Sequence, residues 1–294
     1  MARSDGPAGG LTARAKVNLY LHVTGRRADG YHTLDSLFVR TALCDRLILQ
    51  PGETDSLSVT GPFAGALAGE APERNLALRA VAAVRARCGR GGPVAVNLEK
   101  NIPVAAGLGG GSADAAAALR GASALFEAGL DDEALAELAA GLGADVPACL
   151  HDMPLAVSGI GECLTPLDPL PHFALLLVNP GVALSTADVF RARTGGFSAP
   201  APMTAPADLD GLVAALGARG NDLEAPAIVL APVVGTVLDT LRDLPGARLV
   251  RMSGSGATCF ALFADLAAAQ AAQGVLADLQ PGWWAAATGV AGTR

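Results

Sequence analysis

The chain has 294 residues, of which 51% are hydrophobic and 17% are charged, and its formal net charge is −7 at pH 7. This much apolar material supports a packed core and excludes an intrinsically disordered chain. The negative charge argues against a nucleic-acid-binding protein, which needs a basic surface. It does not exclude an anionic small substrate, because the electrostatic field at a site is local.

The first half of the chain mixes strands and helices without a regular alternation. Polar and apolar residues alternate at 15–24 and predict a strand, and Asp29-Gly30 marks the turn at 25–31 that follows it. Further strands are predicted at 43–49, 57–59 and 94–98. Helices are predicted at 75–87, at 112–128 and from a cap at Asp131 or Asp132 to about Gly143.

The second half continues this mixture. Residues 155–164 are punctuated by glycine, and residues 197–206, rich in Pro, Ala and Ser, are expected to form a mobile loop. Strands are predicted at 173–178, 249–252, 258–263 and 283–289, and helices at 207–218, 228–241 and 266–279. The irregular order predicts an α+β fold, with a domain boundary in the region 155–170.

Apolar runs and the spacing of cysteine and histidine argue against a membrane protein, a secreted protein and a metal site. No apolar run approaches the ~20 residues of a membrane helix, and residues 1–10 lack the apolar segment of a signal peptide. The five cysteines form no Cys-x-x-Cys pair and the four histidines show no metal-ligand spacing. We expect a cytoplasmic protein with a small-molecule substrate and no nucleic-acid or membrane partner, either a monomer or a weak homodimer.

A glycine-rich loop precedes the predicted helix at 112–128. It reads Pro103, Val104, Ala105, Ala106, Gly107, Leu108, Gly109, Gly110, Gly111, Ser112 and Ala113, followed by Asp114. Glycines let backbone N–H groups close on a ligand, and the helix N-terminus attracts anions, so the loop is suited to nucleotide phosphates. The Walker pattern fails because no lysine follows Gly111, and the dinucleotide pattern fails at Ser112. The alternative is a flexible turn before a helix.

Phosphoryl transfer to a hydroxyl needs an aligned acceptor and a group that takes its proton. Asp145, in an apolar setting beyond a helix end, is a candidate base, although it could also cap a helix. Lys16 is one of only two lysines against 19 arginines. It is a candidate for stabilising the carboxylate, although a lone lysine on a strand is usually solvated. A second glycine turn, Ser253 to Gly256, either approaches the ligand or is an ordinary tight turn.

Three segments in this order and spacing resemble the signature motifs of the GHMP kinases, which include galactokinase and the homoserine, mevalonate and phosphomevalonate kinases. They are the strand at 15–19, the loop at 103–113 and the turn at 253–257. The resemblance implies an N-terminal domain like domain 2 of ribosomal protein S5, expected at 1–160, and a ferredoxin-like C-terminal domain, expected at 161–294. It also implies ATP, arriving with Mg²⁺, and substrate meeting in a cleft between the domains.

Residues 15–32 and 143–147 resemble, more specifically, the branch that phosphorylates the C2 hydroxyl of 4-diphosphocytidyl-2-C-methyl-D-erythritol in non-mevalonate isoprenoid synthesis. That resemblance makes Lys16 and Asp145 the catalytic pair. The residues that it assigns to the substrate are Asn18, Tyr31, His32, Thr186 and Phe190. Tyr31 and Phe190 would stack on the cytosine, and His32 would hydrogen-bond its edge. The residues that it assigns to ATP are Asn75, Lys100 and the twelve loop residues from Pro103 to Asp114.

The chain departs from this branch in its phosphate loop. Ala105 and Ala106 stand where glycine is often found, which predicts a stiffer or differently shaped loop. Ala113 removes one hydroxyl from the loop, and no acidic magnesium ligand is evident, so the metal ligands are not identified. Two rival functions remain: a GHMP kinase acting on a smaller alcohol such as mevalonate or homoserine, and a binding or regulatory protein of this fold without catalysis.

Overall fold

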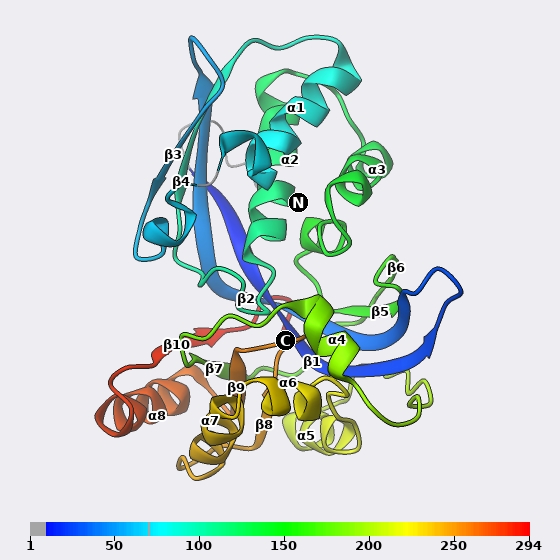
Figure 1. The fold of residues 1–294 in the computed structure, drawn as a ribbon, viewed down its shortest axis with the longest axis vertical. Helices are drawn as coiled ribbons and strands as arrows, with labels where there is room; N and C mark the ends of the chain where they lie inside the picture. The colour runs from blue at the N-terminus through cyan, green and yellow to red at the C-terminus, as the bar shows by residue number, and fades with distance from the viewer. Residues whose placement is uncertain (1–9, 70) are drawn as a thin grey trace. The chain divides into compact units, whose positions relative to one another are not determined.

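A computed structural model describes residues 10–69 and 71–294 of the chain (Figure 1). The described chain forms two compact units, and each unit is assembled from segments that are distant in sequence. The first contains the residues up to Ala15, Cys44–Val104 and Gly109–His151, and the second contains Lys16–Leu43, Ala105–Leu108 and Asp152–Arg294. The predicted domain boundary between residues 160 and 161 remains a prediction.

Two long strands pass through both units, namely β1 (Leu11–Arg26) and β2 (His32–Pro51), which pair with each other. In the first unit β2 also pairs with β4 (Val94–Glu99) in antiparallel fashion, and β3 (Ser56–Thr60) pairs with β4 in parallel. The helices of this unit are α1 (Leu76–Cys88), α2 (Gly110–Leu125) and α3 (Asp132–Leu142). Three short 3₁₀ helices lie at Ala64–Leu67, Pro72–Arg74 and Ala148–Leu150.

Helices α1 and α2 pack side by side in the first unit, and α3 contacts both (Figure 1). The middle of α2 is a run of buried alanines from Ala115 to Ala118. Small side chains let neighbouring elements approach closely, so this run lies at the centre of the first core with Val81, Val84 and Leu98. The predicted cap of α3 is confirmed, since Asp131 Oδ1 accepts from Ala134 N at 2.9 Å. Helix α1 is also capped, because Asn75 Oδ1 accepts from Ala77 N at 3.0 Å.

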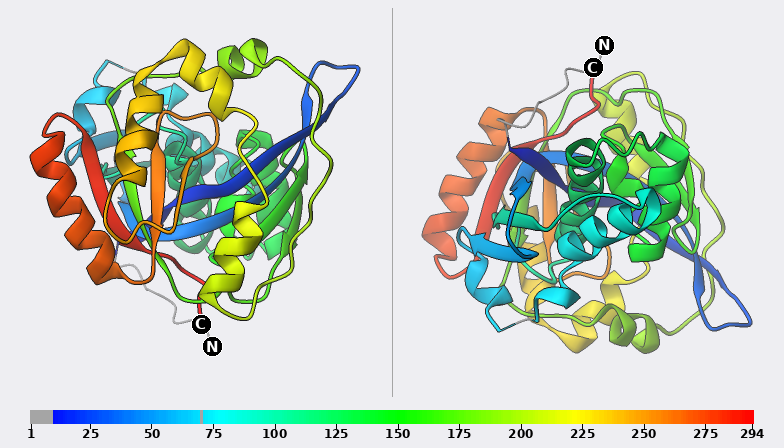
Figure 2. Two further views of the ribbon diagram at one scale, coloured as in Figure 1. Left: turned by 90° about the horizontal axis from the view of Figure 1, so that it is seen from below. Right: turned by 90° about the horizontal axis from the view of Figure 1, so that it is seen from above.

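The second unit contains a four-stranded antiparallel sheet. Its strands are β7 (Ala174–Asn179), β8 (Leu249–Met252), β9 (Cys259–Phe263) and β10 (Trp284–Gly289). Their order in the sheet is β10-β7-β9-β8. When these strands are numbered 1 to 4 along the chain, the order is 4-1-3-2, as in ferredoxin-like sheets. Helices α7 (Val233–Arg242) and α8 (Leu266–Leu279) contact this sheet (Figure 2). Every residue of β7 is buried, as the apolar run predicts.

The second unit also contains a hairpin and three further helices. Strands β5 (Leu155–Gly159) and β6 (Cys163–Pro166) form a hairpin in which β5 pairs with residues 34–38 of β2. The other helices are α4 (Thr186–Ala192), α5 (Leu209–Gly217) and α6 (Glu224–Leu230). The second core is formed by apolar side chains of the sheet, α6, α7 and α8, among them Phe263, Leu238 and Leu276.

The structure departs from the predicted helices at two places. The helix predicted at 228–241 is two helices, α6 and α7, because Pro232 lacks an N–H and interrupts the hydrogen-bond ladder. Helix α4 was not predicted, because its seven residues are too few for a clear apolar period. It begins at the cap Ser185, whose hydroxyl accepts from Asp188 N at 3.3 Å, and it buries Val189.

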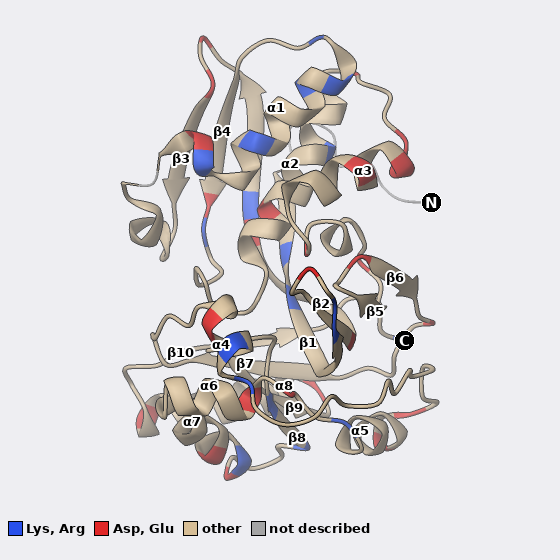
Figure 3. Cartoon of the chain, turned by 45° about the vertical axis from the view of Figure 1, so that its right-hand side comes forward, with Lys and Arg blue, Asp and Glu red and all other residues tan. Residues whose placement is uncertain are grey.

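Residues of both charges are scattered along the described part of the chain, and several of them lie in helices (Figure 3). Within residues 10–69 and 71–294, no helix combines the length and apolar character needed to cross a bilayer.

Candidate active site

Lys16 lies on β1 in the second unit with only 6% of its surface exposed, so the interpretation of it as a solvated lysine is wrong. Its ammonium donates to Asn18 Oδ1 at 2.8 Å and lies 4.7 Å above the ring centroid of Phe38. Lys16 and Asn18 share a face because side chains two apart on a strand point the same way. Asn18 Nδ2 in turn donates to Ser36 Oγ at 2.9 Å. The strand therefore presents a fixed, positively charged polar pair.

The second glycine turn lies between β8 and β9 and is packed against this pair. The backbone N–H of Asn18 donates to Ser253 Oγ at 3.2 Å. Gly254 has φ of 57°, and a Cβ atom there would lie 3.2 Å from Asn18 Oδ1 and 3.7 Å from Lys16 Nζ. A side chain at Gly254 would therefore be strained and would crowd Asn18. The turn is not an ordinary surface turn, because it lies directly beside the predicted catalytic lysine.

The first glycine loop contributes Ala105–Leu108 to the second unit. Leu108 O accepts from Lys16 N at 2.8 Å, and Ser253 Oγ donates to Gly107 O at 3.2 Å. The hydroxyl of Ser253 thus connects Asn18 to the first loop. Ala105 has φ of 54°, in the left-handed region that glycine favours. The alanine adopts the glycine-like conformation despite its methyl group, at the expense of some backbone strain.

The remainder of this loop begins α2 in the first unit. Gly109, with φ of 63°, precedes the helix, and no side chain caps it. Pro103 is buried, whereas Val104 is exposed, and Gly111 and Ser112 lie in the first turn. An uncapped helix start with N–H groups and a positive dipole end is suited to an anion. The alternative of a flexible turn is wrong for residues 106–108 and 110, which are held by close contacts.

Three charged side chains are buried beneath this helix start. Lys100 Nζ donates to the carboxylate of Asp45 and, at 2.8 Å, to Asp114 Oδ2. Burial raises the pKa of Asp114 to about 7, against the opposing influence of Lys100. Asn75, another predicted ATP residue, is 9% exposed and uses its side-chain oxygen to cap α1. The structure therefore brings Lys100 and Asp114 into direct contact and places beside them Asp45, which the sequence analysis did not select.

The predicted base-binding residues lie together in the second unit. The rings of His32 and Phe190 are stacked, with centroids 5.0 Å apart and planes 20° apart. Tyr31 is 62% exposed, which is unusual for a large aromatic side chain. Thr186 Oγ1 shares a hydrogen bond of 2.8 Å with Ser255 Oγ, which connects α4 to the second glycine turn. Desolvation, followed by the charges of Arg26 and Arg193, lowers the pKa of His32, which favours the neutral ring.

Asp145 lies in the first unit, between α3 and the 3₁₀ helix at Ala148–Leu150. Gly143 ends α3, and Pro147 precedes the 3₁₀ helix without a side-chain cap, so Asp145 is the cap residue of neither. The interpretation of Asp145 as a helix cap is therefore wrong. Its side chain is half-buried, and its carbonyl accepts from Cys149 N at 3.3 Å.

Asn221 contributes to the site although no sequence pattern selected it. Its side-chain amide donates to Met252 O and to Gly254 O, both at 2.8 Å, and its Oδ1 accepts from Leu223 N at 2.9 Å. Asn221 therefore holds both carbonyls of the second glycine turn.

Asp45 could have been noticed as a charged residue within a predicted apolar strand. Asn221 left no signal, because it follows a helix in an unremarkable loop.

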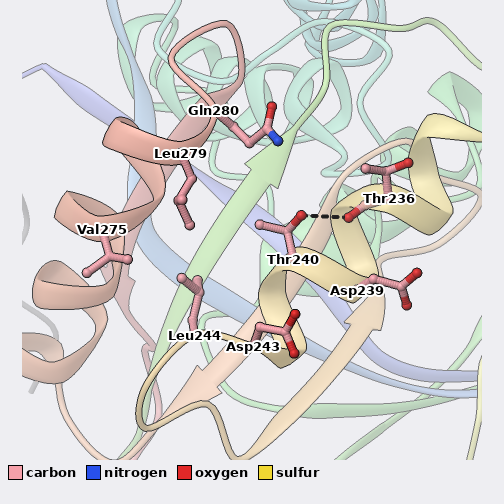
Figure 4. A pocket seen from close by; sticks show the side chains of 8 residues that line it. All are labelled: Thr236, Asp239, Thr240, Asp243, Leu244, Val275, Leu279 and Gln280. Carbon is pink, nitrogen blue, oxygen red and sulfur yellow. Dashed lines mark hydrogen bonds between the residues drawn. The ribbon is translucent and has the colours of Figure 1, made fainter.

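A cavity of about 390 Å³ lies between α7 and α8, away from all these residues (Figure 4). Thr240, Asp243, Val275 and Leu279 are among its lining residues, and none of the predicted site residues lines it. Among the described residues, no group of three or more His, Cys, Asp or Glu side chains is arranged to hold a metal ion.

Comparison with known proteins matches two family descriptions: GHMP kinases N terminal domain at residues 75–153, and GHMP kinases C terminal at residues 207–280. A relative in Rhodospirillum rubrum, named 4-diphosphocytidyl-2-C-methyl-D-erythritol kinase, is 51% identical over 94% of this chain and 90% of its own length. A relative of the same name in Paracoccus denitrificans is 51% identical over 95% of this chain and 96% of its own length.

Two solved structures of kinases superimpose on this chain over almost its full length. A crystal structure of 4-(cytidine 5'-diphospho)-2C-methyl-D-erythritol kinase superimposes with a TM-score of 0.79 at 37% identity, covering 96% of this chain and 99% of that chain. Homoserine kinase from Cytophaga hutchinsonii superimposes with a TM-score of 0.71 at 18% identity, covering 100% of this chain and 98% of that chain. At that identity the second likeness concerns the fold alone.

Proposed function

Because the chain belongs to the GHMP kinase family, we propose that it transfers the γ-phosphoryl group of ATP to the C2 hydroxyl of 4-diphosphocytidyl-2-C-methyl-D-erythritol. The matches cover both domains, which confirms the predicted two-domain α+β fold of this family. Relatives that are 51% identical over 94% and 95% of this chain carry the name of that kinase.

One structural observation favours this acceptor over a smaller alcohol: the stacked pair of His32 and Phe190, with Tyr31 exposed beside it in sequence. Aromatic faces bind flat bases by stacking, and a neutral histidine can both donate and accept at a base edge. Mevalonate and homoserine have no base to occupy such a platform. The same unit holds the polar pair of Lys16 and Asn18 for the remainder of the substrate.

In the proposed reaction the C2 hydroxyl oxygen attacks the γ-phosphorus, the bond from that phosphorus to the β–γ bridging oxygen breaks, and ADP leaves. Asp145 accepts the hydroxyl proton. Lys16 stabilises the developing alkoxide, and its fixed contacts with Asn18 and Phe38 pre-orient the ammonium for that task. Backbone N–H groups of the loop at 103–114 hold the phosphates, whose charge Mg²⁺ arriving with ATP would further neutralise.

Asn18 and Thr186 are proposed to contact the substrate, and Asn75 the nucleotide. A cytoplasmic location and a state no larger than a weak homodimer belong to the same proposal, and light scattering of the purified chain measures the second.

The acceptor is tested with ATP and a panel of alcohols comprising the cytidine substrate, mevalonate and homoserine, with ADP release and phosphorylated product both measured. Turnover of the cytidine substrate alone is the expected result. Turnover of only a nucleotide-free alcohol would replace the proposed substrate by a smaller one. ATP binding without turnover of any acceptor would support a binding or regulatory protein.

The base is tested with Asp145→Asn, which keeps the side-chain shape and removes the proton acceptor. The expected loss in kcat is about 10²–10⁴-fold, as for other general bases. The exposed Asp168→Asn is the matched control, with unchanged kcat. Full turnover by a folded Asp145→Asn protein would exclude the assignment.

A further inference from the structure

Lys100, Asp45 and Asp114 form a nearly solvent-free ionic cluster in the first unit, which we call the α2 anchor. Their exposed fractions are 2%, 0% and 4%. Lys100 Nζ donates to both carboxylates, and Asp45 Oδ1 also accepts from Ile102 N at 2.8 Å. The anchor therefore connects β2, through Asp45, to α2, through Asp114, with the segment after β4 attached to the same carboxylate.

The α2 anchor lies against the first turn of α2. A Cβ atom built on Gly110 would lie 3.0 Å from Lys100 Nζ and 3.1 Å from Ile102 Cγ2. The ammonium is thus close to the first helical residue, and its partner Asp114 lies one turn further along the helix. No side chain caps this helix start, so its first N–H groups are left for another partner. The anchor is the charged contact that lies against this turn.

We propose that Lys100 is a positioning residue for nucleotide binding, which acts through the α2 anchor to hold the first turn of α2 where its N–H groups can receive phosphate oxygens. The inference rests on the proposed use of ATP only for the identity of the ligand. Direct contact between Lys100 and the nucleotide would require the ammonium to leave two buried carboxylates uncompensated, which is strongly unfavourable. Lys100 therefore acts on the nucleotide through α2.

The charge state of the α2 anchor supports this role. With both aspartates ionised its net charge is negative, close to the place where an anion would bind. Burial raises the pKa of Asp114 to about 7, and the charged groups that act on it are Lys100 and Asp45. Asp114 Oδ1 has no hydrogen-bond partner among the described residues, so one oxygen can carry a proton while the other keeps its bond to Lys100. A protonated Asp114 makes the anchor neutral.

The test measures the Kd of a non-hydrolysable ATP analogue without any acceptor, for Lys100→Met, Asp114→Ala and the double variant. We expect each single variant to weaken analogue binding by ~10-fold, which corresponds to about 1.4 kcal/mol. The double variant should bind no more weakly than the weaker single variant, because both remove the same connection. Binding of the cytidine substrate should change by less than about twofold, since the anchor lies in the first unit.

Asp114→Asn keeps the acceptor for Lys100 and is the conservative variant. It should restore analogue binding to within about threefold of the unmodified protein and remove the part of the pH dependence that is due to Asp114. Arg87→Met is the matched control, because it breaks an exposed pair with Glu137 in the same unit. It should leave analogue binding unchanged.

Three outcomes would overturn the inference: unchanged binding in Asp114→Ala while Lys100→Met is weakened, multiplied losses in the double variant, or no restoration by Asp114→Asn. If Lys100→Met does not fold, the inference is tested by analogue binding to Asp114→Ala and Asp114→Asn alone. Absence of turnover on every acceptor would reject the proposed function and leave these binding measurements valid.

Discussion

A Cβ atom on Gly107 would lie 2.6 Å from the carbonyl oxygen of Ser253, although the two residues are 146 positions apart in the chain. Within the second unit the first glycine loop and the second glycine turn are thus in backbone-to-backbone contact. Real Cβ atoms do not approach backbone so closely, so only glycine fits without displacement of one segment. Glycine at position 107 thus leaves room for the backbone of the second glycine turn.

Gly107→Ala is therefore expected to lower the free energy of unfolding by about 1–3 kcal/mol or more. The causes are backbone strain at φ of 76° and the clash of the added Cβ with Ser253 O. Gly181→Ala is the matched control, with φ of 78° in the same unit and no atom within 4 Å of the added Cβ. Chemical denaturation measures both. A loss at Gly107 no larger than the loss at Gly181 would mean that the contact with Ser253 contributes nothing.

Ala105→Gly is expected to leave stability unchanged or to raise it by up to about 1 kcal/mol, because glycine relieves the strain of φ at 54°. Ala106→Gly is the comparison at the buried neighbouring residue, where the methyl is packed and its removal should lower stability. Thermal unfolding of the two variants tests the difference. A clear loss in Ala105→Gly would show that the methyl makes a favourable contact.

Asn221→Ala is expected to lower stability by roughly 1–3 kcal/mol, since two buried carbonyls of the second glycine turn lose their donors. A displaced turn should also lower kcat/KM for the cytidine substrate. Asn221→Asp keeps the acceptor for Leu223 N but sets a carboxylate against Met252 O and Gly254 O, so it should be at least as harmful as the alanine variant. Wild-type kinetics in both variants would contradict this role.

The pKa of Asp114 gives the direction of a pH effect on stability. Because the folded pKa, about 7, lies above the model value of 3.8, the folded state binds more protons between these values. The contribution is fully present below the unfolded pKa and is lost as pH rises through about 7. We expect the free energy of unfolding to fall more steeply between pH 5 and pH 8 in the unmodified protein than in Asp114→Asn. Parallel pH profiles would contradict this expectation.

His32 provides an electrostatic test in the second unit. Desolvation and the charges of Arg26 and Arg193 lower its pKa, so the imidazole stays neutral to a lower pH than an ordinary histidine. Removing one of these charges with Arg26→Gln should raise the pKa. An NMR titration of His32 measures the shift, and the distant Arg242→Gln serves as a control. No change of the His32 pKa in Arg26→Gln would mean that the charge of Arg26 does not contribute to the shift.

Local patterns predicted most regular elements correctly. The predicted bounds of α8 match the structure, and α1 lies within one residue at each end, because both combine a capping residue with helical apolar spacing. The exceptions are the helix divided at Pro232, the short helix α4, the hairpin of β5 and β6, and β2, which begins at His32 and not at residue 43. The proline divides an apolar run that otherwise continues as a helix, and α4 is stabilised by burial of Val189 more than by its own propensity.

The sequence alone determined which residues could carry phosphate and base chemistry: the glycine loop, Lys16, Asp145 and the Tyr31-His32 turn. Only the tertiary structure decided how several of them are supported. It placed Asp45 against Lys100 across 55 positions, Ser253 against Gly107 and Asn221 against the second glycine turn. The physical reason is that a motif depends on local backbone geometry, which short patterns encode. The partners of a buried charge or a close backbone contact depend on chain segments that meet only after folding.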